Sequence, residues 1–226
     1  SSRVGSADVL EALGVRINIT PHQVAACIKD VGIGFMFAPA HHSALRHAAP
    51  VRKQLGFRTI LNMLGPMTNP AGATHQLIGV FDGSLCRTMA EVLGRLGSRR
   101  AMVVHGSDGL DEITIGGLTE AAFLNAGRVE QMQIDPRDYG IALNDASTLV
   151  GGDAETNAAI IRDVLDGQPG PPRDIVLLNA GAALWVAEQA ENLAGGVTLA
   201  AQLIDTGAAL KKLNALIGQT SDPNHG

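Results

Sequence analysis

Apolar residues near the start of the chain recur at the spacing of a helix face. The pattern predicts a helix over residues 6–13, with Ser6 as its N-cap and Gly14 as its C-terminal stop. Thr20 followed by Pro21 is typical of a helix start, and the apolar positions after it predict a second helix that ends at residue 30. The short apolar run at residues 33–37 then predicts a buried strand.

The middle of the chain alternates between strand-like and helix-like patterns. A strand over residues 76–81, a helix over 84–96 and a strand over 101–104 together predict a β-α-β unit with parallel strands. Three more short strands, at residues 112–115, 120–124 and 128–133, have Gly or Asn-Ala-Gly between them and resemble a strand meander. The pattern therefore predicts an α/β fold with a mostly parallel central sheet flanked by helices.

Helical spacing returns in the last third of the chain. Helices are predicted over residues 153–165 and from residue 174 through Trp185, and a last one over 197–216 after a break at Gly195-Gly196. Residues 217–226 are expected to form a flexible tail. No repeat or linker divides the chain, so residues 1–226 are expected to form one domain.

Composition narrows the possible partners. At 226 residues and 46% hydrophobic, the chain can bury a full core. The net charge of -5 and the lack of a Lys/Arg run disfavour nucleic acid and anionic lipid. No apolar stretch reaches the roughly 20 residues that span a bilayer, and no secretion signal opens the chain, so we expect a cytoplasmic protein and no membrane contact. Cys27 and Cys86 are expected to be buried thiols.

Three carboxylates follow the predicted strand at residues 101–104. They lie in the glycine-punctuated stretch His105-Gly106-Ser107-Asp108-Gly109-Leu110-Asp111-Glu112. In open α/β sheets, loops at the carboxyl ends of strands form the ligand crevice. The adjacent pair Asp111 and Glu112 suits Mg²⁺, which proteins hold through one or two carboxylates together with substrate phosphates. An ordinary solvated turn that bends at Asp108-Gly109 explains the same pattern.

A second stretch, between residues 38 and 52, gathers histidine and arginine. His42 and His47 are five residues apart and therefore on different helix faces, which disfavours a zinc site. The planar guanidinium of Arg52 can bind a carboxylate through two hydrogen bonds, although a solvated helix charge fits the pattern equally well.

Several segments of the chain, taken in order, resemble the anthranilate phosphoribosyltransferase family. The two most specific are Asn-Met-Leu-Gly-Pro-Met-Thr-Asn-Pro at residues 62–70 and Asp-Gly-Leu-Asp-Glu at 108–112. The others are Gly-Ser-Ala-Asp-Val-Leu-Glu-Ala-Leu-Gly at 5–14, Val-Gly-Ile-Gly-Phe at 31–35 and Leu-Asn-Ala at 178–180.

This resemblance implies a fold and a reaction. The fold is a small helical domain beside a large α/β domain of the nucleoside phosphorylase and phosphoribosyltransferase type. The reaction transfers the phosphoribosyl group of phosphoribosyl pyrophosphate to the amine of anthranilate, and gives N-(5-phosphoribosyl)anthranilate and pyrophosphate in tryptophan biosynthesis. The resemblance also implies Mg²⁺ as cofactor and a homodimer for the full-length protein. The aryl amine of anthranilate is neutral at pH 7, so no general acid or base is expected.

Particular residues take roles from the same resemblance. Asp111 and Glu112 are expected to bind Mg²⁺, and Ser6 to contact the phosphates of the donor. Anthranilate is expected to meet Arg52 through its carboxylate, in a channel lined by Pro39, His42 and Leu45. Some relatives carry Tyr at the position of Leu45.

The family's glycine-rich donor loop and its Lys-His-Gly-Asn segment are expected upstream of Ser1. Most of the small N-terminal helical domain is therefore expected to be absent, and the 226-residue chain alone to be inactive. Two alternatives stay open. One is a pyrimidine nucleoside phosphorylase-like enzyme, which residues 62–70 also fit. The other is a non-catalytic paralogue that binds nucleic acid on the same fold, which the net charge of -5 disfavours.

Overall fold

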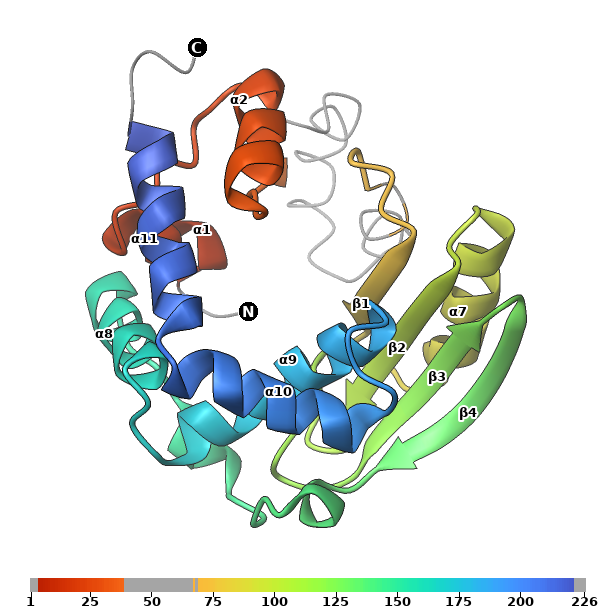
Figure 1. The fold of residues 1–226 in the computed structure, drawn as a ribbon. Coiled ribbons are helices and arrows are strands. Elements are labelled where there is room, and N and C mark those ends of the chain that lie inside the picture. The colour runs from red at the N-terminus through yellow and green to blue at the C-terminus, as the bar shows by residue number, and fades with distance from the viewer. Residues whose placement is uncertain (1–3, 39–66, 68, 222–226) are drawn as a thin grey trace, which may run out of the picture. The chain divides into compact units, whose positions relative to one another are not determined.

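The computed structural model describes residues 4–38, 67 and 69–221, and its contacts divide the chain into two compact units (Figure 1). The first unit comprises Ser1–Thr59, Gly151–Gly167 and Ile204–Gly226, and its described part is helical. The second comprises Ile60–Val150 and Gln168–Leu203 and contains a four-stranded sheet. The prediction that residues 1–226 form one domain stays a prediction.

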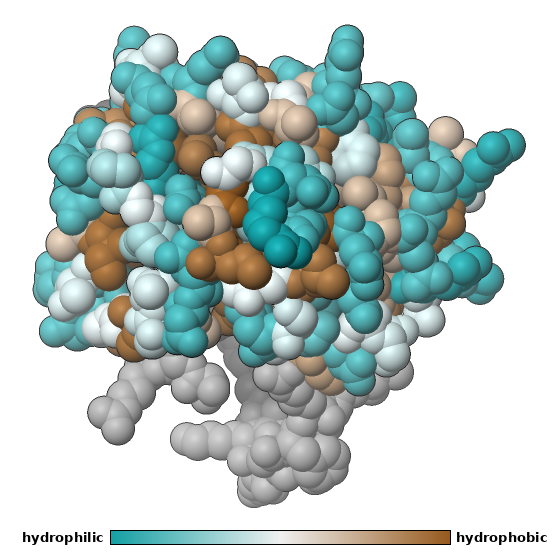
Figure 2. Space-filling model, turned by 90° about the horizontal axis from the view of Figure 1, so that it is seen from below, coloured by the Kyte–Doolittle hydropathy of each residue, from teal (hydrophilic) through white to brown (hydrophobic). Residues whose placement is uncertain are grey.

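The surface of the described residues is mixed in polarity. Figure 2 shows a face on which hydrophilic residues surround several smaller groups of apolar ones. Among the described residues, no single helix is long and apolar enough to cross a membrane. Only taken together are the helices Leu193–Asp205 and Ala208–Ser221 long and apolar enough, and they meet at a bend of 65°.

The first unit packs short helices around small apolar clusters. Val9, Leu13 and Ala158 form one cluster, and Val15, Cys27 and Leu216 form another. The elements are α1 (Ser6–Ala12), α2 (Pro21–Ala26), the π-helical turn η1 (Cys27–Val31), α8 (Ala154–Leu165) and α11 (Ala208–Ser221). Thr20 caps α2, as its place before Pro21 predicts, and Asp153 caps α8. Each side chain accepts a hydrogen bond from the backbone N–H three residues further on.

Three predictions in this unit are wrong at the level of single residues. Ser6 is the first residue of α1 and not its cap, because Gly5 holds the N-cap position and donates its N–H to the Asp8 carboxylate at 2.8 Å. Residues 33–37 form no strand, and Ile33 is 44% exposed. α11 continues to Ser221, so residues 217–221 of the predicted tail are helical.

The second unit contains β1 (His75–Gly79), β2 (Arg100–Gly106), β3 (Thr119–Asn125) and β4 (Arg128–Ile134), in that spatial order. β1 and β2 are parallel, and α7 (Leu85–Arg95) connects them, which confirms the predicted β-α-β unit. The other two pairings are antiparallel, so the part of the sheet that the structure describes is mixed rather than mostly parallel. Both antiparallel pairings involve β3, which pairs with β2 on one side and forms a hairpin with β4 on the other.

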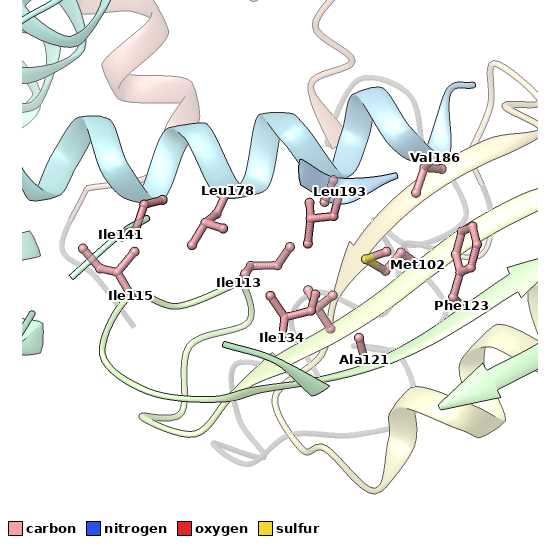
Figure 3. Close-up of a cluster of buried hydrophobic side chains, with 12 residues drawn as sticks. Met102, Ile113, Ile115, Ala121, Phe123, Ile134, Ile141, Leu178, Val186 and Leu193 are labelled. Atoms are coloured by element: carbon pink, nitrogen blue, oxygen red, sulfur yellow. The ribbon is translucent and has the colours of Figure 1, made fainter. Parts of the chain in front are cut away.

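Helices cover both faces of this sheet (Figure 1). α7 packs its buried face on alternate residues of β1, β2 and β3, among them Val103 and Leu124. α9 (Pro171–Val186) and α10 (Leu193–Asp205) cover the opposite face, where Leu178 and Leu193 point toward Ile113 and Met102 (Figure 3). The strand period of two thus sends successive side chains into two separate apolar layers. Two 3-10 turns, η2 (Pro136–Tyr139) and η3 (Ala146–Leu149), lead from the sheet toward α8.

Glycines bring α9 and α10 into close contact. A Cβ atom on Gly196 would lie 2.1 Å from the carbonyl oxygen of Gly181, so only glycine fits at this crossing. The predicted break at Gly195-Gly196 is therefore wrong, because both residues lie inside α10. The chain bends instead at Gly207, which has a φ of +71°.

The C-terminal end of α9 is tied to the start of the sheet. Glu188 follows the helix in a left-handed conformation with φ of 61°, and Gln189 N–H donates to the Leu184 carbonyl at 2.9 Å. The Glu188 carboxylate pairs with His75 at 3.2 Å and with Arg100 at 3.3 Å, at the first residues of β1 and β2. These two partners lower the pKa of Glu188, the hydrogen bond from His75 most. α9 is thus anchored to the sheet at its polar end as well as through the apolar layer.

Candidate functional site

The carboxyl ends of β1 and β2 lie side by side. Gly79 is opposite Val104, because the two strands are parallel and in this register. Residues 101–104 are almost completely buried, so the polar residues that follow them emerge at this edge of the sheet. The His105 ring connects the two strand ends, since its Nδ1 lies 2.9 Å from the Val80 carbonyl oxygen and therefore carries the proton. The acidic loop, residues 107–118, begins here.

Asp108 organises the first turn of the acidic loop. Gly109 has a φ of +89° and donates its N–H to the Gly106 carbonyl at 2.9 Å. The Asp108 carboxylate accepts from Leu110 N–H at 3.2 Å and from the Thr114 hydroxyl. The predicted bend at Asp108-Gly109 is confirmed. Because both oxygens of Asp108 already have partners inside the loop, this carboxylate is structural.

The acidic pair, Asp111 and Glu112, has exposed side chains on a backbone that is fixed from two sides. On one side, Gly79 approaches so closely that a Cβ atom there would lie 1.6 Å from the Asp111 carbonyl oxygen. On the other side, Ile113 is fully buried and exchanges two hydrogen bonds with the Asn179 side chain, at 3.0 Å and 2.8 Å. The backbone that carries these two exposed carboxylates is therefore held in place from both sides.

Residues 112–115 are not the strand that their alternating pattern predicts. Their backbone groups bond to side chains, since Asn179 pairs with Ile113 and Thr119 Oγ1 accepts from Thr114 N–H at 3.0 Å. Ile113, Thr114 and Ile115 are fully buried, although Glu112 is exposed, and the Asn179 side chain takes the place of a neighbouring strand.

The two negative charges of the acidic pair repel each other. The pKa of Glu112 is raised, first because surrounding protein removes part of its hydration and second because the Asp111 carboxylate repels it. A bound cation would offset both effects by its attraction for the charged carboxylate. Two carboxylates also suit Mg²⁺ that is completed by water and substrate phosphate. Within the part of the chain that the structure describes, no group of three or more metal-ligating side chains lies together.

The other predicted site residues are placed only in part. Ser6 is exposed at the N-terminus of α1, in the first unit, and its role toward the donor phosphates stays a prediction. The predicted anthranilate contacts lie outside the described residues, and their roles also stay predictions: Pro39, His42, Leu45 and Arg52.

Two residues of the site have no role in the sequence analysis. Asn179 belongs to the matching Leu-Asn-Ala segment, which signals importance without showing what the amide binds. Gly79 lies inside the predicted strand 76–81, where a glycine indicates close backbone approach, but the sequence does not say to what.

Comparison with known proteins assigns the family. The family model described as "Glycosyl transferase family, a/b domain" matches residues 1–210. The chain belongs to this glycosyl transferase family. It is 54% identical to the anthranilate phosphoribosyltransferase of Nitrosomonas europaea over 96% of the chain and 64% of the relative. The corresponding protein of Thioalkalivibrio sulfidiphilus is also 54% identical, over 98% of the chain and 65% of the relative.

Solved structures of glycosyl transferase family members agree with the fold. The anthranilate phosphoribosyltransferase of Thermus thermophilus matches with a TM-score of 0.90 and 41% identity, over 98% of the chain and 66% of that structure. The Saccharomyces cerevisiae enzyme in complex with PRPP and Mg matches with a TM-score of 0.83 and 25% identity, over 96% and 63%. The α/β class and the resemblance predicted from the motifs are confirmed. The chain spans slightly less than two thirds of the length of these relatives.

Proposed function

We propose that the protein transfers the phosphoribosyl group of phosphoribosyl pyrophosphate to the amine of anthranilate, as part of tryptophan biosynthesis. The observation that carries this proposal is 54% identity, over nearly the whole chain, to proteins named for that reaction. The acidic pair at the carboxyl end of β2 supports it, because an enzyme acting on pyrophosphate needs cationic charge beside the leaving group.

Asp111 and Glu112 would hold Mg²⁺ in this proposal. When bound, the ion would supply positive charge to the pyrophosphate as the bond to ribose breaks. The fit is supported by the two exposed carboxylates on one fixed backbone and by the raised pKa of Glu112, which a cation would lower. A similar yeast structure is in complex with PRPP and Mg, which agrees with this choice of metal.

The remaining residues would act by positioning. Arg52 would bind the anthranilate carboxylate, Pro39, His42 and Leu45 would line its channel, and Ser6 would contact the donor phosphates. The amine of anthranilate is neutral at pH 7 and can attack the ribose carbon as the bond to pyrophosphate breaks, and the nitrogen then loses one proton to water. Catalysis would therefore rest on alignment of the two substrates and on charge stabilisation, with no general acid or base.

The test is turnover by the protein expressed from its complete gene. Loss of anthranilate fluorescence would be followed with phosphoribosyl pyrophosphate and Mg²⁺, and the expected result is Mg²⁺-dependent consumption of anthranilate. Replacing the acidic pair in the double variant Asp111→Asn/Glu112→Gln should abolish turnover while leaving the thermal midpoint close to wild type, because both side chains are exposed.

A matched control is Glu130→Gln/Asp138→Asn, which changes the net charge equally at two exposed positions outside the acidic loop. Its turnover should equal that of wild type. Wild-type protein that consumes no anthranilate would refute the proposed function. Phosphorolysis of pyrimidine nucleosides, or binding of single-stranded DNA in its place, would favour one of the alternatives.

We also propose a homodimer and a cytoplasmic location. Light scattering on the same protein tests the first, and a monomeric mass at working concentration would contradict it. Cell fractionation tests the second.

A further inference from the structure

We propose that Asn179 is a positioning residue for the metal site, because its side chain sets the backbone that carries Asp111 and Glu112. The inference rests on the proposed function and adds a residue to it. Asn179 lies on α9, 66 positions from Ile113 in the sequence, and contacts the acidic loop within the second unit.

The amide of Asn179 uses both of its ends on one residue. Its Oδ1 accepts from Ile113 N–H at 3.0 Å, and its Nδ2 donates to the Ile113 carbonyl at 2.8 Å. The same Nδ2 donates to the Ile175 carbonyl, one helical turn earlier, at 3.0 Å. Rotating the amide by half a turn would put donor against donor and acceptor against acceptor, so the network fixes its orientation. The geometry is that of one rung of an antiparallel ladder, supplied by a side chain.

α9 is a stable platform for this contact. Leu178 and Ala182, on either side of Asn179 along the helix, are fully buried in the apolar layer. Gly181 touches α10 through its backbone, and Glu188 ties the helix end to β1 and β2. A side chain mounted here keeps its position better than one mounted on a loop.

The contact reaches the acidic pair through a single peptide bond. The Ile113 N–H, which donates to Asn179 Oδ1, belongs to the peptide unit whose carbonyl is that of Glu112. Gly79 limits the Asp111 carbonyl from the other side. Loss of the Asn179 amide would therefore leave two buried backbone groups without this partner and free the loop on one side only. The carboxylates would then move relative to the strand ends.

A purely structural role would predict a different outcome, and the experiment separates the two. Asn179→Ala removes all three hydrogen bonds. Asn179→Asp keeps the size and the acceptor but loses the donor to both carbonyls. Val186→Ala is the control, because Val186 is a buried residue of the same helix and apolar layer and does not bond to the loop.

The main readout is direct binding of Mn²⁺, used as a paramagnetic substitute for Mg²⁺, in the presence of pyrophosphate. Free Mn²⁺ is measured by electron paramagnetic resonance, and thermal midpoints and the KM for anthranilate are measured in parallel. We expect both Asn179 variants to bind Mn²⁺ about 10- to 100-fold more weakly, the range usual for partners that orient metal ligands. Val186→Ala should lower the thermal midpoint but bind Mn²⁺ like wild type, and the KM for anthranilate should change little in all three.

Unchanged Mn²⁺ affinity in a folded Asn179 variant would overturn the inference, and so would equal weakening in Val186→Ala. If Asn179→Ala does not fold, Asn179→Asp decides by the same criterion. If wild-type protein turns over anthranilate and the Asn179 variants keep full Mn²⁺ affinity, the role of Asn179 is refuted and the proposed function stands. Wild-type protein that neither binds Mn²⁺ with pyrophosphate nor consumes anthranilate would overturn the proposed function together with it.

Discussion

Substituting Gly79 by alanine tests how closely the sheet edge limits the acidic loop. The added Cβ would lie 1.6 Å from the Asp111 carbonyl oxygen and 2.4 Å from its carbonyl carbon. Real Cβ atoms do not approach other heavy atoms below 3.0 Å, so the loop or the strand must move. The shift needed is about 1.4 Å, the difference between this 3.0 Å limit and the 1.6 Å to the Asp111 carbonyl oxygen. Misplacement on this scale can cost about 100-fold in rate.

The strand cannot absorb that shift cheaply. Gly79 pairs with Val104, and the next residue, Val80, donates its N–H to the Val104 carbonyl at 2.9 Å. Overpacking a closed site of this kind costs about 1 to 3 kcal/mol, or roughly 2 to 12 °C in thermal midpoint for a chain of this size. We therefore expect Gly79→Ala to lower stability and to lower turnover about 100-fold, with the larger loss of turnover at low Mg²⁺ concentration.

The assay combines thermal unfolding with anthranilate consumption over a range of Mg²⁺ concentrations. The matched control is Gly218→Ala, the same chemical change on the exposed part of α11 with open space around the new methyl group. This control should gain about 0.5 to 1 kcal/mol, since alanine is the better helix former. Gly79→Ala with wild-type stability and wild-type turnover would show that the loop tolerates displacement and that the close approach of Gly79 does not fix the acidic pair.

Four further outcomes are expected. Arg52→Ala should raise the KM for anthranilate by a factor equivalent to about 2 to 3 kcal/mol, and an unchanged KM would remove Arg52 from the pocket. Gly196→Ala should lower stability by about 1 to 3 kcal/mol in urea unfolding, because the new methyl group would meet the backbone of α9. Burial, with a smaller contribution from nearby carboxylates, raises the pKa of Cys86 to about 11, so iodoacetamide at pH 8 should label it far more slowly in native than in unfolded protein, as mass spectrometry would show. Folding lowers the pKa of Glu188, so its ion pairs stabilise the protein above the pKa of the unfolded state and are lost as pH falls through the pKa of the folded state. The urea midpoint of Glu188→Gln should therefore approach that of wild type in acid. A difference between the two midpoints that stays constant with pH would contradict this.

Local patterns predict most of the elements because local energies determine them. The caps at Thr20 and Asp153 depend on side chains three residues from the N–H groups they bind, so a short window contains the whole interaction. The parallel pairing of β1 and β2 also follows from the sequence, since a crossover helix between two apolar strands leaves few other arrangements. The Ser6 cap fails by one residue because the neighbouring glycine can take the same backbone conformation.

Contacts between distant segments explain the predictions that fail. Gly195-Gly196 has the composition of a helix break, but Gly196 serves the crossing with α9, and a local window contains no information about that neighbour. Residues 112–115 alternate as a strand does, yet their partner is an amide 66 positions away from Ile113. The proposed metal ligands, Asp111 and Glu112, belong to a recognisable motif. The contact of Asn179 with their backbone depends on the packing of α9 against the sheet, which no local pattern contains.

The two anchors of the acidic loop can be observed separately by hydrogen exchange. The Ile113 amide is protected by a helix side chain, and the Thr114 amide by the hydroxyl of Thr119 at the start of β3. Adjacent amides therefore report on different opening events, one of α9 and one of the β-hairpin. A perturbation that loosens the helix layer should accelerate exchange at the first amide before the second.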